Sequence, residues 1–227
     1  EAMVTNPVIN PVAGFEPMQR LVPVTKAFYL QQVFAVTEAL KVKSFNDLIA
    51  LAKAKPKTLN YMSASLTKTA FVEDFNKTNG IDLLRVPFKG GGPGTAATLG
   101  GHVPLAVSAV PTASTYIRGG NLRALALFSS KRSSALPDIP TMAEATGHDL
   151  PADIVNGFVV PAGTPKPVID FLHKEVVKVM TMPDTRQRLA AMGFDPVAST
   201  PEEFAAWISS EIVRWGKVIR DARITVQ

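Results

Sequence analysis

The stretch that decides the fold runs from residue 58 to residue 88 and reads TLNYMSASLTKTAFVEDFNKTNGIDLLRVPF. It predicts a short strand at Thr58–Met62 and, after the polar loop Ser63–Thr69, a helix that ends at Asn79-Gly80. A second strand follows at Leu83–Phe88. Strands that alternate with helices through short connections indicate a parallel, doubly wound sheet.

The alternation extends to both sides of this stretch. Upstream, Val22–Val36 is an apolar segment that suits one or two strands buried on both faces. Ser44 begins a helix that stops before Pro56. Downstream, the sequence predicts strands at Leu105–Val110 and Leu122–Phe128. It also predicts short helices at Thr95–Leu99 and Thr112–Arg118, and a loop at Lys89–Gly94.

After Ser129 the pattern changes, and three longer helices are expected. These lie near Pro165–Met180, Asp184–Met192 and Pro201–Ala222. Thr200 and Glu203 form a capping box at the start of the last helix. An apolar stripe that includes Phe204 and Trp215 recurs along it at helical spacing, and we expect this stripe to face a core.

Together these patterns predict an α/β chain of two lobes. Residues 34–126 form the second lobe, and residues 1–33 with residues 127–227 form the first lobe. The chain then crosses between the lobes about twice, an arrangement that suits hinge closure over a ligand.

Composition excludes several classes of protein. The 227 residues include no cysteine, which rules out disulfides, thiolate zinc sites and a cysteine nucleophile. The net charge of +5 comes from scattered Lys and Arg without interleaved aromatics, so we expect no nucleic-acid partner. No window approaches the roughly 20 apolar residues of a membrane span, and no signal peptide is visible.

Catalytic patterns are also missing from the sequence. It contains no HExxH, no nucleophile elbow and no P-loop lysine, and its three histidines are far apart. We therefore expect no enzyme activity, no metal and no cofactor.

Hydroxyl side chains crowd the start of the helix behind the first strand. Ser63, Ser65, Thr67 and Thr69 lie within seven residues, where helix capping needs one hydroxyl. A helix N-terminus also offers unpaired N–H groups and a partial positive charge, which suit an anion. These residues alone do not distinguish helix capping from anion binding.

Six segments occur along the chain in an order that carries a resemblance. They read LNYMSA (59–64), VPFKGGGP (86–93), GGNLRALA (119–126), KRSSALPDIPT (131–141), VPAGTP (160–165) and TPEEF (200–204). This succession resembles the Bug or TctC family, the solute-binding receptors of tripartite tricarboxylate transporters. The resemblance runs from about Phe15 onward.

The resemblance implies a two-lobed, periplasmic-binding-protein-like fold that closes on a small carboxylate. It also implies a periplasmic location and membrane subunits of a tripartite tricarboxylate transporter as partners. The loop of the second lobe that contacts ligand in the family corresponds to Ser63, Ala64, Ser65 and Thr67, beside Thr69. A strand end that faces the cleft corresponds to Ser108, ahead of Thr112.

Several positions depart from the family pattern. The loop after Ser63 lacks the usual glycines, and Ser108 stands where an acidic residue is common. Lys68 could pair with a second carboxylate or lie in solvent, and we favour solvent.

The opening β-α-β unit of the family is not found before Phe15. We therefore expect an incomplete first lobe, which would expose sheet edges and apolar surface that a homodimer could cover. The alternative function is a truncated structural remnant that oligomerises and binds no small molecule. A small hydrolase or lyase, the third alternative, would need a nucleophile and base that the sequence does not show.

Overall fold

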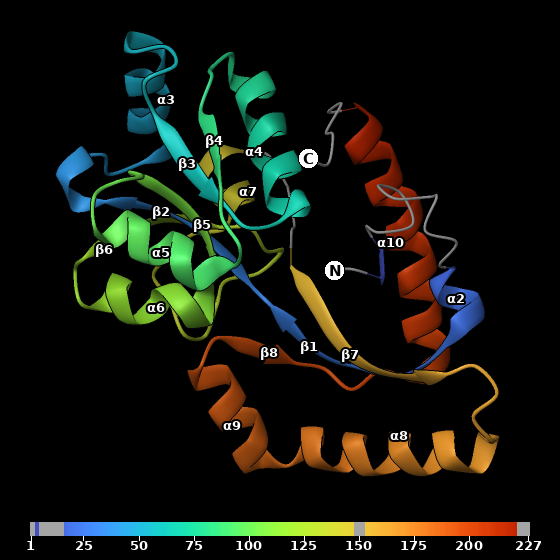
Figure 1. The fold of residues 1–227 in the computed structure, drawn as a ribbon. Helices are drawn as coiled ribbons and strands as arrows, with labels where there is room; N and C mark the ends of the chain where they lie inside the picture. The colour runs from blue at the N-terminus through green and yellow to red at the C-terminus, as the bar shows by residue number, and fades with distance from the viewer. Residues whose placement is uncertain (1–2, 5–15, 148–152, 222–227) are drawn as a thin grey trace. The chain divides into compact units, whose positions relative to one another are not determined.

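The computed structural model describes residues 3–4, 16–147 and 153–221. Contacts divide the chain into two compact units: unit 1 is Glu1–Tyr29 with Ile154–Gln227, and unit 2 is Leu30–Asp153. Figure 1 shows the helices and strands of both units.

Unit 2 contains a five-stranded sheet in the order β4-β3-β5-β2-β6. Its strands are β2 (Gln32–Thr37), β3 (Asn60–Ser63), β4 (Leu84–Pro87), β5 (Leu105–Ala109) and β6 (Leu122–Leu127). Strand β3 pairs in parallel with β4 and β5, whereas β2 runs antiparallel to both of its neighbours. The sheet is therefore mostly parallel, as the sequence predicts, with one reversed strand.

Helices cover both faces of this sheet (Figure 1). They are η2 (Glu38–Leu40, a 3-10 turn), α3 (Phe45–Ala54), α4 (Leu66–Asn79), α5 (Gly91–Leu99), α6 (Val110–Arg118) and α7 (Met142–Thr146). Side chains of α3, α4 and α7 pack into one core, and side chains of α6 pack into a second core. The sheet is therefore doubly wound.

Strand β2 is the most buried strand of unit 2. Val33, Phe34, Ala35 and Val36 are each 1% exposed or less. Their side chains alternate between the two faces: Phe34 and Val36 enter the larger core and Val33 the smaller one. A strand covered on both faces needs a continuous apolar run, which explains the sequence of this segment.

Aromatic rings fill the larger core. The Phe34 ring lies 5.2 Å from Phe45 of α3 and 6.4 Å from Phe75 of α4, measured between centroids. The Phe71 ring of α4 meets Phe128 edge-on at 4.2 Å. The Phe34–Phe45 and Phe71–Phe128 pairs are edge-to-face, and such pairs add about 0.5–1.5 kcal/mol each to the burial of the rings. They therefore favour the packing of α3 and α4 in this core.

A polar relay lies inside unit 2 at the two points where the chain changes units. The Gln31 amide donates to Ser129 Oγ at 3.1 Å and to the Lys131 carbonyl at 3.2 Å. Ser129 Oγ in turn donates to Asp153 Oδ2 at 2.8 Å. These hydrogen bonds link Gln31, just after the chain enters unit 2, to Asp153, the last residue before the chain leaves it.

Unit 1 contains a three-stranded sheet in the order β7-β1-β8. Its elements are α2 (Pro17–Arg20), β1 (Leu21–Leu30), β7 (Ile154–Pro161), α8 (Lys166–Thr181), α9 (Pro183–Ala191), β8 (Phe194–Pro196) and α10 (Pro201–Asp221). Within this unit, α10 lies on one side of the sheet and α8 on the other (Figure 1). Phe204 and Ile208 of α10 pack on Val155 of β7.

Helix α10 has the capping box and the core-facing apolar stripe that the sequence predicts. Thr200 and Glu203 exchange both hydrogen bonds of a capping box, at 2.9 and 3.1 Å. Phe204, Ile208 and Trp215 are each 6% exposed or less, so the stripe faces the core. The three predicted helices after Ser129 correspond to α8, α9 and α10.

Three details differ from the sequence-based expectation. The second change of unit falls after Asp153 and not at 126/127, because Leu127 bridges to Thr141 and Met142 packs in the core of unit 2. Helix α5 begins at Gly91, inside the segment expected to be a loop. Strand β8 was not expected from the sequence, since it has three residues and no alternating pattern.

We expect Gly157→Ala to destabilise unit 1. An added Cβ would lie 2.5 Å from the Phe204 ring and 2.6 Å from the Thr25 carbonyl oxygen. Overpacking of this kind costs about 1–3 kcal/mol. The control is Gly92→Ala in α5, where a Cβ would meet nothing within 4 Å. Denaturant unfolding should show a loss only for Gly157→Ala, and equal stability of the two variants would contradict this packing.

Candidate functional site

Three helices of unit 2 begin at one edge of its sheet. The register pairs Ser63 with Pro87 and Met62 with Ala106, so parallel strands β3, β4 and β5 end at the same edge. Helices α4, α5 and α6 follow these strand ends. In open α/β sheets, ligands bind outside the carboxyl ends of the strands, so this edge is the candidate site.

The hydroxyls at the start of α4 form one hydrogen-bonded cluster. Ser65 is the N-cap, and its Oγ accepts from the Lys68 N–H at 3.4 Å. Its Oγ also lies 3.1 Å from Thr67 Oγ1. Ser63 Oγ and Thr69 Oγ1 are 3.0 Å apart, and each lies 3.0 Å from the Ser65 carbonyl oxygen. The structure thus brings these four predicted residues together.

This cluster explains why four hydroxyl side chains lie where helix capping needs only one. Capping uses the Ser65 hydroxyl, while the Ser63 and Thr69 hydroxyls hold the turn between β3 and α4. Ser63 is 1% exposed and Thr69 is 3% exposed. The number of hydroxyls alone therefore does not indicate an anion, because internal hydrogen bonds account for it.

Lys68 differs from its expected environment. Its exposed fraction is 7%, so it is buried in the first turn of α4 and not in solvent. Thr67 is 5% exposed, and Ala64 and Ser65 are half-buried. The expectation that Lys68 lies in solvent is therefore wrong, although lysine is rarely buried to this extent.

Ser108 lies on β5, two residues beyond the partner of Met62 in the neighbouring strand. It is fully buried, and its Oγ lies 3.1 Å from Thr95 Oγ1 of α5. Thr112 is half-buried in the first turn of α6. Sequence reasoning missed Thr95, although its place directly after the glycine run was a usable signal.

The glycine run positions α5 on β3. A Cβ at Gly94 would lie 2.7 Å from the Met62 sulfur, so a larger residue there would displace the Met62 side chain. Gly90, the N-cap, has a φ of +104°, which also favours glycine. The Phe88 N–H donates to the Ser63 carbonyl at 3.0 Å and joins the ends of β4 and β3.

A hydrogen bond of the Tyr61 side chain links β3 to α4. Its hydroxyl donates to Glu73 Oε1 at 3.1 Å, and the residue has no exposed surface. Burial, with the nearby Glu73 carboxylate, raises the pKa of Tyr61 far above its ordinary value. The hydroxyl therefore stays protonated and remains a donor to Glu73.

Within residues 3–4, 16–147 and 153–221, no group of three or more His, Cys, Asp or Glu side chains could hold a metal ion. In the same ranges, no helix has the length and apolar character needed to span a bilayer.

Comparison with known sequences finds similarity over nearly the whole chain. Residues 1–224 match the profile described as tripartite tricarboxylate transporter family receptor. Protein BugT of Bordetella pertussis is 32% identical over 215 residues, which cover 94% of this chain and 66% of BugT. A UPF0065 protein of Pseudomonas sp. is 28% identical, covering 98% of this chain and 67% of that protein. The chain thus spans about two thirds of the length of these relatives.

Solved structures show the same fold. A periplasmic transporter matches with a TM-score of 0.90 and 30% identity, covering 99% of this chain and 76% of that one. R. palustris Rpa4515, solved with adipate, matches with a TM-score of 0.90 and 27% identity, covering 97% and 74%. The periplasmic binding protein BugD, at 24% identity and a TM-score of 0.87, supports the fold alone.

We expect the Ser108–Thr95 pair to be mainly structural. Ser108→Ala should cost about 1–2 kcal/mol of unfolding free energy, since it leaves the buried Thr95 hydroxyl with one partner fewer. The double variant with Thr95→Val should cost less than the sum of the two single changes. Urea unfolding of the four proteins measures this coupling. Additive costs would show that the two hydroxyls do not depend on each other.

Proposed function

The chain belongs to the tripartite tricarboxylate transporter receptor family, and from this premise we propose that it captures a small organic carboxylate. Members of this family are solute-binding receptors and not enzymes. The proposed function is therefore reversible binding without covalent chemistry.

The observation that carries this proposal is the capped first turn of α4 at the carboxyl edge of β3. Helix geometry leaves the first-turn N–H groups without carbonyl partners inside the helix, and the helix dipole favours negative charge there. The internal bonds of Ser63 and Thr69 hold this turn in one shape. A carboxylate that approaches the turn would meet oriented donors, which lowers the ordering cost of binding.

Eight residues of unit 2 are proposed to form or support the site. They are Ser63, Ala64, Ser65, Thr67, Lys68, Thr69, Ser108 and Thr112. We assign contact with ligand to the turn around Ala64, Ser65 and Thr67, because the first two are half-buried. Ser63, Thr69 and Ser108 support that turn and the strand end beside it.

A dicarboxylate is the ligand class that the comparisons favour. Rpa4515, with 27% identity to this chain, was solved with adipate. The ammonium group of Lys68, in the first turn of α4, would favour a second negative charge nearby.

The remaining parts of the function are also proposals. Family membership supports a periplasmic location and delivery of the ligand to membrane subunits of a tripartite tricarboxylate transporter. Closure on the ligand is proposed on the same footing. Association of two copies through the first lobe is a proposal that family membership does not support.

Ligand binding predicts a rise in melting temperature with an organic acid. A ligand at 100 times its dissociation constant adds about 2.7 kcal/mol to the unfolding free energy. The panel contains adipate, a tricarboxylate, an acidic amino acid and an aromatic acid, and adipamide serves as the uncharged control. A shift with an acid and none with adipamide is expected. No shift with any acid would leave the structural remnant as the better interpretation.

The position of the site is tested by two substitutions of nearly equal size. Asn and Asp both cap helices as well as Ser does, so Ser65→Asn and Ser65→Asp should keep the stability of α4. Only Ser65→Asp adds a negative charge at the turn, and it should weaken binding of the acid at least about tenfold, or about 1.4 kcal/mol. Titration calorimetry compares the two proteins. Equal affinities would move the site away from Ser65.

A further inference from the structure

Gln32, the first residue of β2, has a buried side-chain oxygen that lacks a hydrogen-bond donor. The residue is 0% exposed. Its Nε2 donates to the Leu30 carbonyl at 3.0 Å, and this bond distinguishes the amide nitrogen from the amide oxygen, because a carbonyl only accepts. Within the part of the chain that the structure describes, Oε1 of Gln32 has no partner.

A buried acceptor of this kind reduces stability. The oxygen gives up its hydrogen bonds to water on folding and gains none in return, so native proteins contain few such groups. The residues that follow, from Val33 to Val36, are apolar and each 1% exposed or less. An apolar side chain at position 32 would continue this run without an unpaired acceptor. Departures from the local pattern of this kind are expected at functional positions.

Gln32 lies at the sheet edge that contains the candidate site. It pairs with Ala109, the last residue of β5, because β2 and β5 are antiparallel. Ser63, the last residue of β3, ends at the same edge. Side chains alternate along a strand, so Gln32 shares with Phe34 the face of the sheet on which α4 packs.

Contacts of α4 place Gln32 near the first turns of that helix. The Phe75 ring of α4 lies 6.4 Å from the Phe34 ring. One turn closer to the start of α4, the Phe71 ring lies 4.2 Å from the Phe128 ring. The Phe128 N–H donates to the Gln32 carbonyl at 2.9 Å. The step from Phe34 to Gln32 therefore follows α4 toward its N-terminus.

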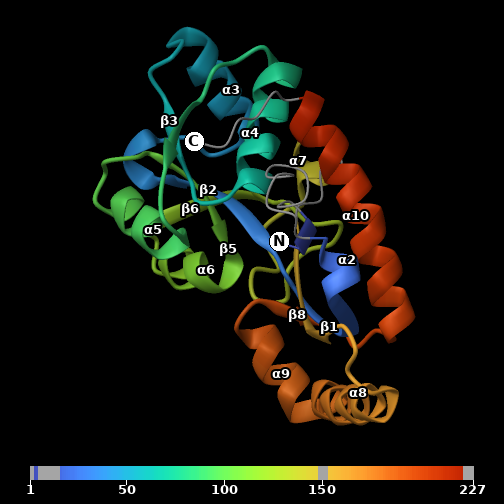
Figure 2. The ribbon, with the colours of Figure 1, turned by 45° about the vertical axis from the view of Figure 1, so that its right-hand side comes forward.

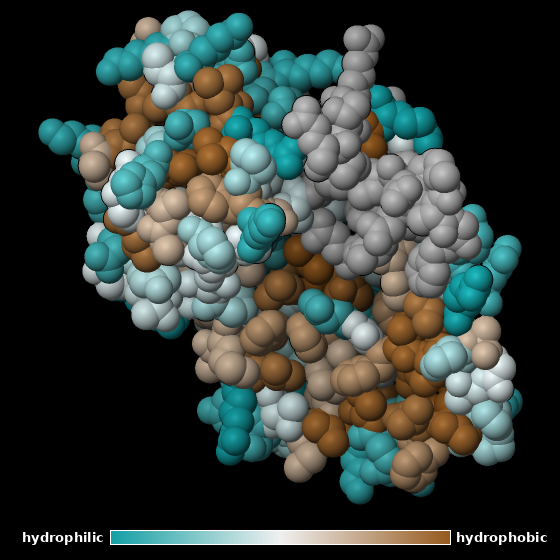
Figure 3. Space-filling view, in the orientation of Figure 1, coloured by the Kyte–Doolittle hydropathy of each residue, from teal (hydrophilic) through white to brown (hydrophobic). Residues whose placement is uncertain are grey.

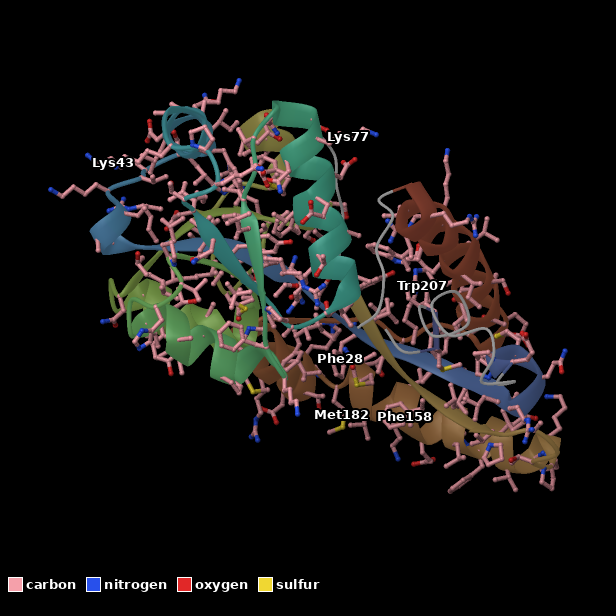
Figure 4. The ribbon with its side chains drawn as sticks, turned by 45° about the horizontal axis from the view of Figure 1, so that its top comes forward. Phe28, Lys43, Lys77, Phe158, Met182 and Trp207 are labelled. Atoms are coloured by element: carbon pink, nitrogen blue, oxygen red, sulfur yellow. The ribbon has the colours of Figure 1, made fainter. Side chains whose placement is uncertain are left out.

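The views of the molecule agree with this placement. Figures 2 and 4, seen from different directions, both show the start of α4 next to the start of β2. Figure 4 marks Lys77 near the opposite end of α4. The exposed residues of α4 include Asp74, Lys77 and Thr78, and hydrophilic residues are seen over this part of unit 2 in Figure 3. The aromatic residues of α4 thus face the sheet.

The edge therefore combines two kinds of polar group. The first-turn N–H groups of α4 are donors, which suit a carboxylate. Oε1 of Gln32 is only an acceptor, which suits an O–H or N–H group and disfavours a carboxylate oxygen. A carboxylate that also has a hydroxyl or amino group would satisfy both.

We propose that Gln32 determines specificity at the carboxylate site, by accepting a hydrogen bond from a hydroxyl or amino group of the ligand through Oε1. This inference rests on the proposed function and narrows its ligand class to hydroxy and amino carboxylic acids. Because Oε1 is enclosed, a ligand without such a group leaves the acceptor unpaired. A site of this kind discriminates strongly against the analogue that lacks the donor.

Pairs of acids that differ by one hydroxyl group test the specificity of the unchanged chain. Each acid that raises the melting temperature is compared by titration calorimetry with its matched analogue, as malate is with succinate and 2-hydroxyadipate with adipate. The hydroxy acid should bind at least about tenfold more tightly. Equal affinities within the pairs would overturn the role of Gln32. Absence of binding by every acid would instead show that the proposed function itself fails.

Substitution of the glutamine tests whether Gln32 is the source of this preference. Gln32→Met is similar in size and removes the acceptor, so the ratio of the two affinities should approach one. The control is Gln31→Met, which removes a neighbouring buried amide whose Nε2 already donates to Ser129 and Lys131. The control should keep the preference for the hydroxy acid. A preference that persists in Gln32→Met, as expected if Oε1 bonds only to a trapped water, would refute the proposal, and so would equal loss in both variants.

Discussion

The reversed strand β2 is the constraint on which unit 2 depends. It pairs with β5 on one side and β6 on the other, and both faces of its apolar run are covered. Because β5 and β6 both run opposite to β2, they point the same way as β3 and β4. All the helices that follow these parallel strands therefore start at one edge. A polar or β-breaking change in Val33–Val36 would remove the common support of both cores, not a single contact.

Sequence reasoning recovered the parts of the fold that local chemistry determines. The alternation of strands and helices from Thr58 to Phe128, the three C-terminal helices and the capping box at Thr200 are present. The start of α5 could not be predicted from propensity, because glycines disfavour helix and packing of Gly94 on Met62 overrides that preference. The direction of β2 depends on pairing across about 90 residues, which local patterns do not encode.

The candidate site shows the same division between local and long-range information. The crowding of hydroxyls at the start of α4 was visible in the sequence, but their mutual hydrogen bonds were not. Those bonds show that the Ser63 and Thr69 hydroxyls hold the turn between β3 and α4. The buried state of Lys68 and the pairing of Ser108 with Thr95 also required the tertiary fold. The proposed class of ligand rests on family membership, because no single residue type in the sequence indicates it.

The relay from Gln31 through Ser129 to Asp153 has a consequence for the order of folding. Unit 1 is assembled from two segments that are separated in sequence by the whole of unit 2. Bringing distant segments together costs chain entropy that rises with the length of the intervening loop. Once unit 2 has folded, the relay holds residues 31 and 153 together, so the flexible loop between β1 and β7 has already been closed. Folding of unit 2 would therefore lower the entropy cost of bringing the two segments of unit 1 together.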